Sequence, residues 1–296
     1  MEKDSSIVKK ILALPLWCIL AYVLMVAGSL LGLVTALITK AVPSLAGNNV
    51  WLTAKMYLEF WGIWAAFFLC LLIPINKPLI NAVNTKAKGN TVKGLLVGFL
   101  IGFGMNTLCA LCAMINGDIH IYFDSFNIVP FILVFICVFI QSSAEELVCR
   151  CFLYQHLRRL YKNPWIAIIC NFVFFGAGHL ANDGMSVVSF ISIMLTGLLF
   201  SLIVYYFDSL WCAFGIHAAW NFTQNILFGL PNSGVVTSYS VFKLDATKAR
   251  TSFFYDAAFG IEGSSMSCVI LALACVVVIV LGKKRGPSSY NIWEVK

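Results

Sequence analysis

The stretch FNIVPFILVFICVFIQSSAEELVCR, residues 126–150, decides the fold class of this chain. Its first part, up to Ala144, is uncharged and mostly apolar, as in a helix that crosses the roughly 30 Å hydrocarbon core of a bilayer. Three charges follow, on Glu145, Glu146 and Arg150. Charged groups at membrane depth cost about 2.5 to 3.5 kcal/mol each on insertion scales, so they usually face a partner or a polar cavity. The stretch therefore predicts a membrane helix that carries a functional site.

The composition of the whole chain is that of an integral membrane protein. Of its 296 residues, 60% are hydrophobic and 11% are charged, and the mean hydropathy is +0.89. Soluble domains are about 45 to 50% apolar. The net charge of +7 could indicate nucleic acid as a partner, but the cations stand in short clusters between apolar runs. Because such clusters orient membrane proteins, we expect the lipid bilayer, in the plasma membrane, and no nucleic acid.

Two other features of the sequence have simple interpretations. The apolar run from Ile11 to Thr39 is far longer than the roughly 7 to 15 apolar residues of a cleavable signal, so we expect a first helix that is kept. Nearly all of the eleven cysteines, including Cys109 and Cys112 of a C-x-x-C pattern, lie in apolar runs. There cysteine behaves as a small hydrophobic residue, so we expect it to serve in packing.

Apolar segments predict an all-α, polytopic membrane helix bundle of about eight transmembrane helices, a single membrane domain over residues 1–296. The expected spans are 12–38, 51–75, 92–115, 127–150, 164–181, 186–207, 209–228 and 265–282. Cations cluster in alternate connections, which places both termini on the cytoplasmic side. Residues 229–263 then form a long non-cytoplasmic loop, although that loop holds Lys243, Lys248 and Arg250.

Few ionisable residues lie within the predicted spans. Lys55 and Glu59 stand four residues apart near a span end, and this spacing predicts a structural ion pair. Glu146 and Arg150 have the same spacing and can neutralise each other. Glu145 is rotated by about 100° from Glu146 on a helix, so it must point to a different neighbour.

Two histidines and an asparagine are the partners that the sequence offers to Glu145. His179 ends the run NFVFFGAGH, and His217 and Asn221 project from one face of the seventh span. A glutamate and a histidine can deprotonate water, alone or with a bound metal, and His and Asn can donate hydrogen bonds to an oxyanion. These residues predict a polar site within the bundle that hydrolyses an amide.

Three short motifs carry a resemblance to a known family. In order along the chain they are Glu145-Glu146-x-x-x-Arg150, Phe175-x-x-x-His179 and His217-x-x-x-Asn221. They resemble the motifs of the CPBP intramembrane proteases, also called the Abi or CAAX amino-terminal protease family, which includes type II CAAX prenyl endopeptidases. The resemblance covers residues 127–225, the expected catalytic core, and the stretches FGLPNSG (228–234) and FGIEGS (259–264) also look like bacterial members.

The resemblance implies a role for each motif residue. Glu145 and His179 would activate the attacking water, and His217 and Asn221 would form the oxyanion hole. Glu146, Arg150 and Phe175 would support the site. The family is commonly described as metalloproteases, which leaves open a divalent metal such as Zn²⁺ on Glu145, His179 and His217, although Asn221 would be a poor zinc ligand.

Counting 1.5 Å per residue along the predicted helices leaves the height of His179 unexplained. This count places Glu145 and His217 in the cytoplasmic half of the membrane and His179 nearer its outer face. The histidine can reach the other two residues if the fifth span begins after Pro164, or if the fourth span runs past Arg150.

Three functions fit these residues. The first is an intramembrane endopeptidase that acts on a membrane-associated protein or peptide, such as a CAAX protein, a leader peptide or a bacteriocin-like precursor. The second is a non-catalytic membrane scaffold or bacteriocin-immunity protein with the same fold. The third is a proton-coupled transporter, which inverted repeats and broken helices would favour.

Overall fold

The computed structural model describes residues 2–286 and 290–294. The predicted cytoplasmic ends also include residues 1, 287–289 and 295–296, which lie outside the described residues. The helices are α1 (Glu2–Gly32), α2 (Thr35–Ala41), α3 (Asn49–Leu58), α4 (Trp61–Cys70), α5 (Ile80–Val83), α6 (Val92–Ile115), α7 (Ile128–Glu146), α8 (Tyr154–Leu160), α9 (Pro164–Ala177), α10 (Val187–Phe207), α11 (Leu210–Asn221) and α12 (Ser265–Arg285). Two π-helical segments, Leu147–Leu153 and Phe222–Leu227, continue α7 and α11.

Long apolar helices dominate the structure, as predicted for an integral membrane protein. Five helical runs are long and apolar enough to cross a bilayer: Lys10–Ala41, Val92–Ile115, Ile128–Leu160, Val187–Phe207 and Ser265–Arg285. The predicted second span is broken between α3 and α4, and Asn49–Cys70 makes an angle of 117° with Pro74–Val83. Counting this bent pair as one span gives up to six candidate spans among the described residues, against the eight predicted. The two remaining predicted spans correspond to α9, a shorter apolar helix, and to α11 with its π-helical continuation.

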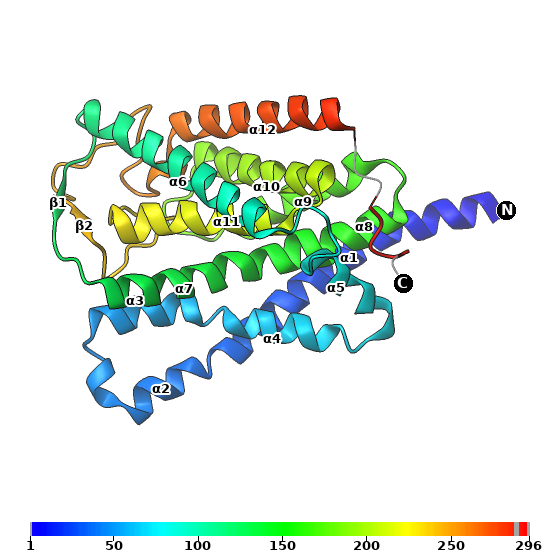
Figure 1. Ribbon diagram of the computed structural model, residues 1–296, viewed down its shortest axis with the longest axis horizontal. Coiled ribbons are helices and arrows are strands. Elements are labelled where there is room, and N and C mark those ends of the chain that lie inside the picture. Colours follow the sequence, from blue (N-terminus) through cyan, green and yellow to red (C-terminus); the bar gives the residue numbers. More distant parts are fainter. Residues whose placement is uncertain (1, 287–289, 295–296) are drawn as a thin grey trace.

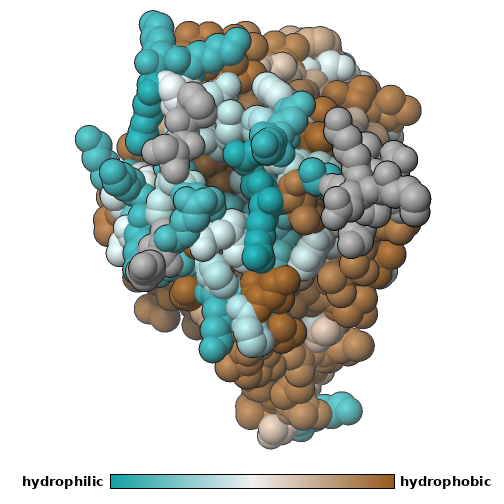
Figure 2. Space-filling model, turned by 90° about the vertical axis from the view of Figure 1, so that its right-hand side faces the viewer, coloured by the Kyte–Doolittle hydropathy of each residue, from teal (hydrophilic) through white to brown (hydrophobic). Residues whose placement is uncertain are grey.

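Both described chain ends lie at one end of the bundle, at the right of Figure 1. The connection between α5 and α6, the connection between α8 and α9, and the end of α12 lie at the same end. Seen from this side, hydrophilic side chains gather in the centre and toward the left edge, and hydrophobic side chains lie mainly on the right and below (Figure 2). Exposed cations on these segments include Lys86, Lys88, Lys162, Lys283 and Lys284.

The opposite end of the bundle carries a small two-stranded antiparallel sheet, which the apolar pattern of the sequence did not predict. β1 (Ile121–Phe123) pairs with β2 (Phe242–Leu244), and Tyr122 lies opposite Lys243. The pairing brings the connection after α6 against the 229–263 loop.

The three cations of the 229–263 loop are each paired with an acid. Lys243 Nζ lies 2.9 Å from Asp124 Oδ2, and Lys248 Nζ lies 2.9 Å from Asp245 Oδ2. Arg250 Nε lies 3.2 Å from Asp118 Oδ1. Two of these ion pairs join the loop to the connection between α6 and α7.

Close packing of α6 on α11 sets the position of the helix that bears His217 and Asn221. The Thr91 hydroxyl accepts a hydrogen bond from Gly94 N and begins α6. A Cβ at Gly98 would lie 2.3 Å from Cys212 O, and one at Gly102 would lie 2.2 Å from Ile216 O. Only residues without a side chain allow the two backbones to approach so closely.

Candidate active site

A cavity of about 350 Å³ lies inside the bundle, and its two walls differ in chemistry. The polar wall comes from α7, α9, α11 and the 229–263 loop, and it holds all four predicted catalytic residues: Glu145, His179, His217 and Asn221. The other wall is largely apolar and comes from α1, α3 and their neighbours, with Met25, Met56, Tyr57 and Phe60.

The predicted ion pair on α7 and its continuation is present and fully buried. Arg150 Nη1 lies 3.0 Å from Glu146 Oε1, and both side chains are 0% exposed. Arg150 also donates from Nη2 to Gly197 O, at 3.1 Å. Its guanidinium carbon lies 4.4 Å from the ring centre of Phe175, so that Phe175 stabilises the cation with its π face. These contacts tie α7, α9 and α10 together behind the cavity.

His217 joins the two glutamates. Its Nδ1 lies 3.0 Å from Glu146 Oε1, and its Nε2 lies 3.8 Å from Glu145 Oε2. The Glu146 carboxylate, paired with Arg150, can only accept a hydrogen bond, so Nδ1 of His217 is the donor. Nε2 is therefore the ring nitrogen turned toward Glu145.

Glu145 has a partner that the sequence analysis did not identify. Gln141, one turn earlier on α7, donates from Nε2 to Glu145 Oε1 at 2.7 Å. Glu145 Oε2 has no hydrogen-bond partner among the described residues. One oxygen of this carboxylate is thus held by the protein, and the other is buried with its hydrogen-bonding capacity unused.

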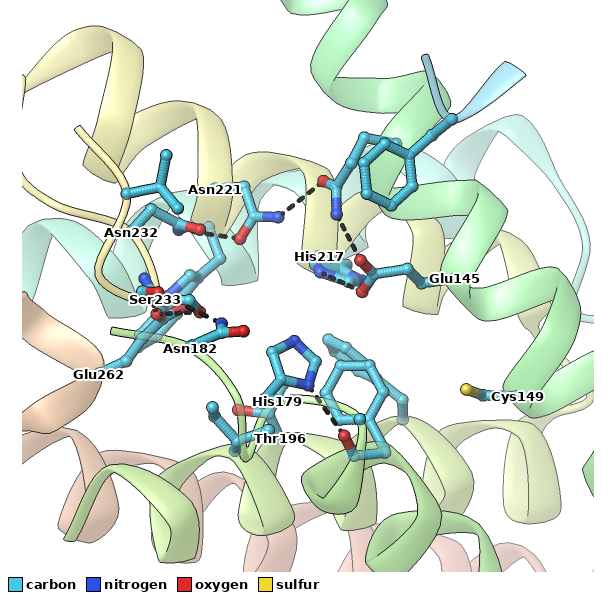
Figure 3. A pocket seen from close by; sticks show the side chains of 18 of the residues that line it. Glu145, Cys149, His179, Asn182, Thr196, His217, Asn221, Asn232, Ser233 and Glu262 are labelled. Atoms are coloured by element: carbon cyan, nitrogen blue, oxygen red, sulfur yellow. Dashed lines mark hydrogen bonds and ion pairs between the residues drawn. The ribbon is translucent and has the colours of Figure 1, made fainter. Parts of the chain in front are cut away.

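His179 lies opposite Glu145 and His217 across the cavity (Figure 3). Its Nδ1 lies 2.8 Å from the carbonyl oxygen of Phe175, which can only accept, so Nδ1 carries a proton. The neutral ring then has its lone pair on Nε2. Of the two explanations offered for its height, the structure agrees with the second: α9 begins at Pro164, and the helical run that contains Glu145 continues to Leu160.

Both π-helical segments begin directly after site residues, one after Glu146 and the other after Asn221. Such segments are rare and frequently occur at functional sites. The apolar pattern of the sequence gave no indication of them.

The 229–263 loop returns to the cavity instead of projecting away from the bundle. Glu262 accepts hydrogen bonds from the backbone N and the hydroxyl of Ser233, both at 2.7 Å, and from Trp220 Nε1 at 3.1 Å. Enclosure raises the pKa of the Glu262 carboxyl, and the hydrogen bonds from Ser233 and the nearby His179 oppose this rise. Ser233 and Glu262 stand in FGLPNSG and FGIEGS, two stretches noted for their resemblance, but nothing in the sequence placed them at the site.

The proposed metal ligands are not assembled in one place. In the part of the chain that the structure describes, no three His, Cys, Asp or Glu side chains are grouped closely enough to hold a metal ion. Glu145 and His217 are neighbours, but His179 stands on the other side of the cavity. The site therefore does not fit a resident metal.

Comparison with known proteins gives one family match. Residues 126–223 match the family described as type II CAAX prenyl endopeptidase Rce1-like. The matched segment contains the residues of all three motifs. No curated protein matches the chain.

Proposed function

We propose, from the Rce1-like domain that residues 126–223 form, that the chain is an intramembrane endopeptidase. The family implies a protease. Its reaction would be hydrolysis of a peptide bond in a membrane-associated protein or peptide, with a CAAX protein, a leader peptide or a bacteriocin-like precursor as candidate substrates. In this proposal eight elements, including α9 and α11, cross the plasma membrane, and both termini are cytoplasmic.

The observation that carries the proposal is the pairing of Glu145 with His217 at the wall of an internal cavity. Glu145 Oε2 is buried and without a hydrogen-bond partner among the described residues, 3.8 Å from His217 Nε2. A water bound to Oε2 would lose a proton to the carboxylate as it attacks the substrate carbonyl carbon. His179, on the opposite wall, would help to activate this water through the lone pair on its Nε2.

His217 and Asn221 would stabilise the oxyanion that forms on the substrate. Because Nδ1 of His217 donates to Glu146, Nε2 can donate to an oxyanion only when the ring carries both protons. Asn221 directs its amide nitrogen toward Gln141 Oε1 and Ser142 Oγ, at 3.0 and 3.2 Å, and would give one of its N–H groups to the oxyanion.

The test is a cleavage assay on purified protein in detergent with a library of membrane-associated peptides. We expect Glu145→Gln to abolish cleavage, because a neutral amide cannot accept the proton from water. Glu59→Gln is the matched control, since Glu59 pairs with Lys55 at 2.6 Å outside the cavity and should keep activity. Cleavage that survives Glu145→Gln would exclude the mechanism, and a chelator arm should leave the rate unchanged.

The scaffold or immunity function is the second candidate, and the same variants separate it from the protease. A scaffold would keep its biological effect in the Glu145→Gln variant, because shape and packing are preserved. A protease would lose that effect together with cleavage.

A further inference from the structure

Three side-chain amides form a continuous chain that ends on Glu145. Asn232 Nδ2 donates to Asn221 Oδ1 at 3.1 Å, and Asn221 Nδ2 lies 3.0 Å from Gln141 Oε1. Gln141 Nε2 then donates to Glu145 Oε1 at 2.7 Å. Figure 3 shows these bonds along the upper edge of the cavity.

The chain has a single possible direction while Glu145 is ionised. A carboxylate only accepts, so Gln141 must turn its NH₂ group to Glu145 and its carbonyl to Asn221. Asn221 must then turn its NH₂ group to Gln141 and its carbonyl to Asn232. Asn232 completes the chain as a donor. The orientation of each amide, NH₂ group or carbonyl oxygen first, thus fixes the orientation of the next one.

We propose that Gln141 is a positioning residue for Glu145, and that Asn232 of the 229–263 loop sets its orientation through Asn221. The proposal rests on the proposed function, because it assigns a purpose to the carboxylate that activates water. Gln141 holds Oε1, so the free oxygen, Oε2, faces His217. Without that bond the carboxylate can rotate, and the attacking water loses its place.

The loop end of the chain is itself held firmly. Asn232 pairs with Val235 through backbone hydrogen bonds of 2.9 Å in both directions. The adjacent Ser233 has a φ of +49° and is fixed by two bonds to Glu262. A non-glycine residue in this conformation persists only where its surroundings impose it. The loop therefore holds Asn232 in one position. In this proposal the position of the loop is coupled, through the amides, to the orientation of the Glu145 carboxylate.

The first test compares Gln141→Met with Gln141→Glu in the cleavage assay across pH. Gln141→Met removes a hydrogen bond to a charged group, the Glu145 carboxylate. We expect this change to lower kcat roughly ten- to hundredfold, with little change in KM. Gln141→Glu should be as slow at neutral pH but recover relative to wild type at acid pH, where the introduced carboxyl is protonated and can donate. The rate is expressed as the ratio to wild type at each pH, so that pH effects common to both proteins cancel.

The second test uses the far end of the chain. Asn232→Asp replaces a donor with an acceptor, which opposes the direction that Glu145 imposes on the amides, and it should lower kcat roughly tenfold, with acid recovery. Asn182→Asp is the matched control: Asn182 Nδ2 also bonds this loop, at 3.2 Å from Ser233 O, but it is outside the chain of amides. Its variant should show no acid recovery. Equal acid recovery in both variants, or none in Asn232→Asp, would overturn the coupling.

A third measurement does not depend on activity. The infrared carboxylate band of Glu145, identified by its loss in Glu145→Gln, should shift in Gln141→Met and in Asn232→Asp but not in Asn182→Asp. An unshifted band in Gln141→Met would overturn the positioning role even if the protein cleaves no peptide. If wild type cleaves no peptide but the band shifts in Gln141→Met, the proposed function is overturned and the positioning role of Gln141 stands.

Discussion

His217 Nδ1 lies 3.0 Å from Glu146 Oε1, so Glu146, and not Glu145, is the carboxylate that orients the histidine. The same Oε1 atom is 3.0 Å from Arg150 Nη1. One buried oxygen therefore serves two cationic or polar partners, and its removal should affect folding as well as catalysis.

Glu146→Leu and Arg150→Met should each destabilise the protein by about 3 to 5 kcal/mol, because each leaves an unpaired charge in the interior. The double variant should be less destabilised than the sum of the two. Thermal unfolding in detergent measures all three, and strictly additive effects would show that the pair does not act as a unit.

His179→Gln should lower kcat by about 10²- to 10⁴-fold, the range of general-base catalysis. The unfolding temperature should change little, because His179 is half-buried and its ring is hydrogen-bonded to the Phe175 carbonyl one turn earlier in the chain. A kcat within a factor of three of wild type would remove His179 from the reaction.

Gly102→Ala should destabilise the protein by about 1 to 3 kcal/mol through overpacking against Ile216, one residue before His217. Gly104→Ala on the same helix is the control, since nothing lies within 4 Å of its added Cβ. That change should be neutral or stabilising by up to about 1 kcal/mol. Equal losses in the two variants would contradict the close approach of α6 and α11.

Asp118 gives a pH-dependent contribution at the loop end. Burial acts to raise the pKa of Asp118, but hydrogen bonds from Ser252, Asn116 and Arg250 outweigh it and hold this pKa below its usual value. The folded state thus favours the ionised form. Its contribution is present above the unfolded pKa of about 3.9 and is lost as the pH falls through the lower folded value.

The measurement for Asp118 is the difference in unfolding temperature between wild type and Asp118→Asn. The difference should be full at neutral pH and shrink under acid conditions. A difference that does not change with pH would show that the carboxylate charge has no part in joining the two loops.

The sequence predicted the site where helical spacing places residues on one face. The pair of Glu146 with Arg150, and the shared face of His217 and Asn221, follow from a separation of four residues on a helix. Glu145 was expected to lack a partner on its own helix because only charged residues were considered, although the neutral Gln141 stands at the same spacing on its other side.

Other features depend on contacts that no local pattern encodes. The return of Asn232 and Glu262 to the cavity depends on loop packing across long separations in the chain. The π-helical segments arise where tertiary contacts override a regular α-helical pattern. The break between α3 and α4 lies beside Glu59, whose pairing with Lys55 was predicted correctly while the break was not.

Four residues of the apolar wall of the cavity, Met25, Met56, Tyr57 and Phe60, lie outside the matched segment 126–223. In the proposed protease, part of the surface that contacts the substrate would thus be encoded apart from the residues that react. Two proteins could share the helices that carry the proposed catalytic residues and differ in helices α1 to α4. Such proteins would differ in substrate preference through substitutions of the apolar residues that line the cavity, while the reaction stayed the same.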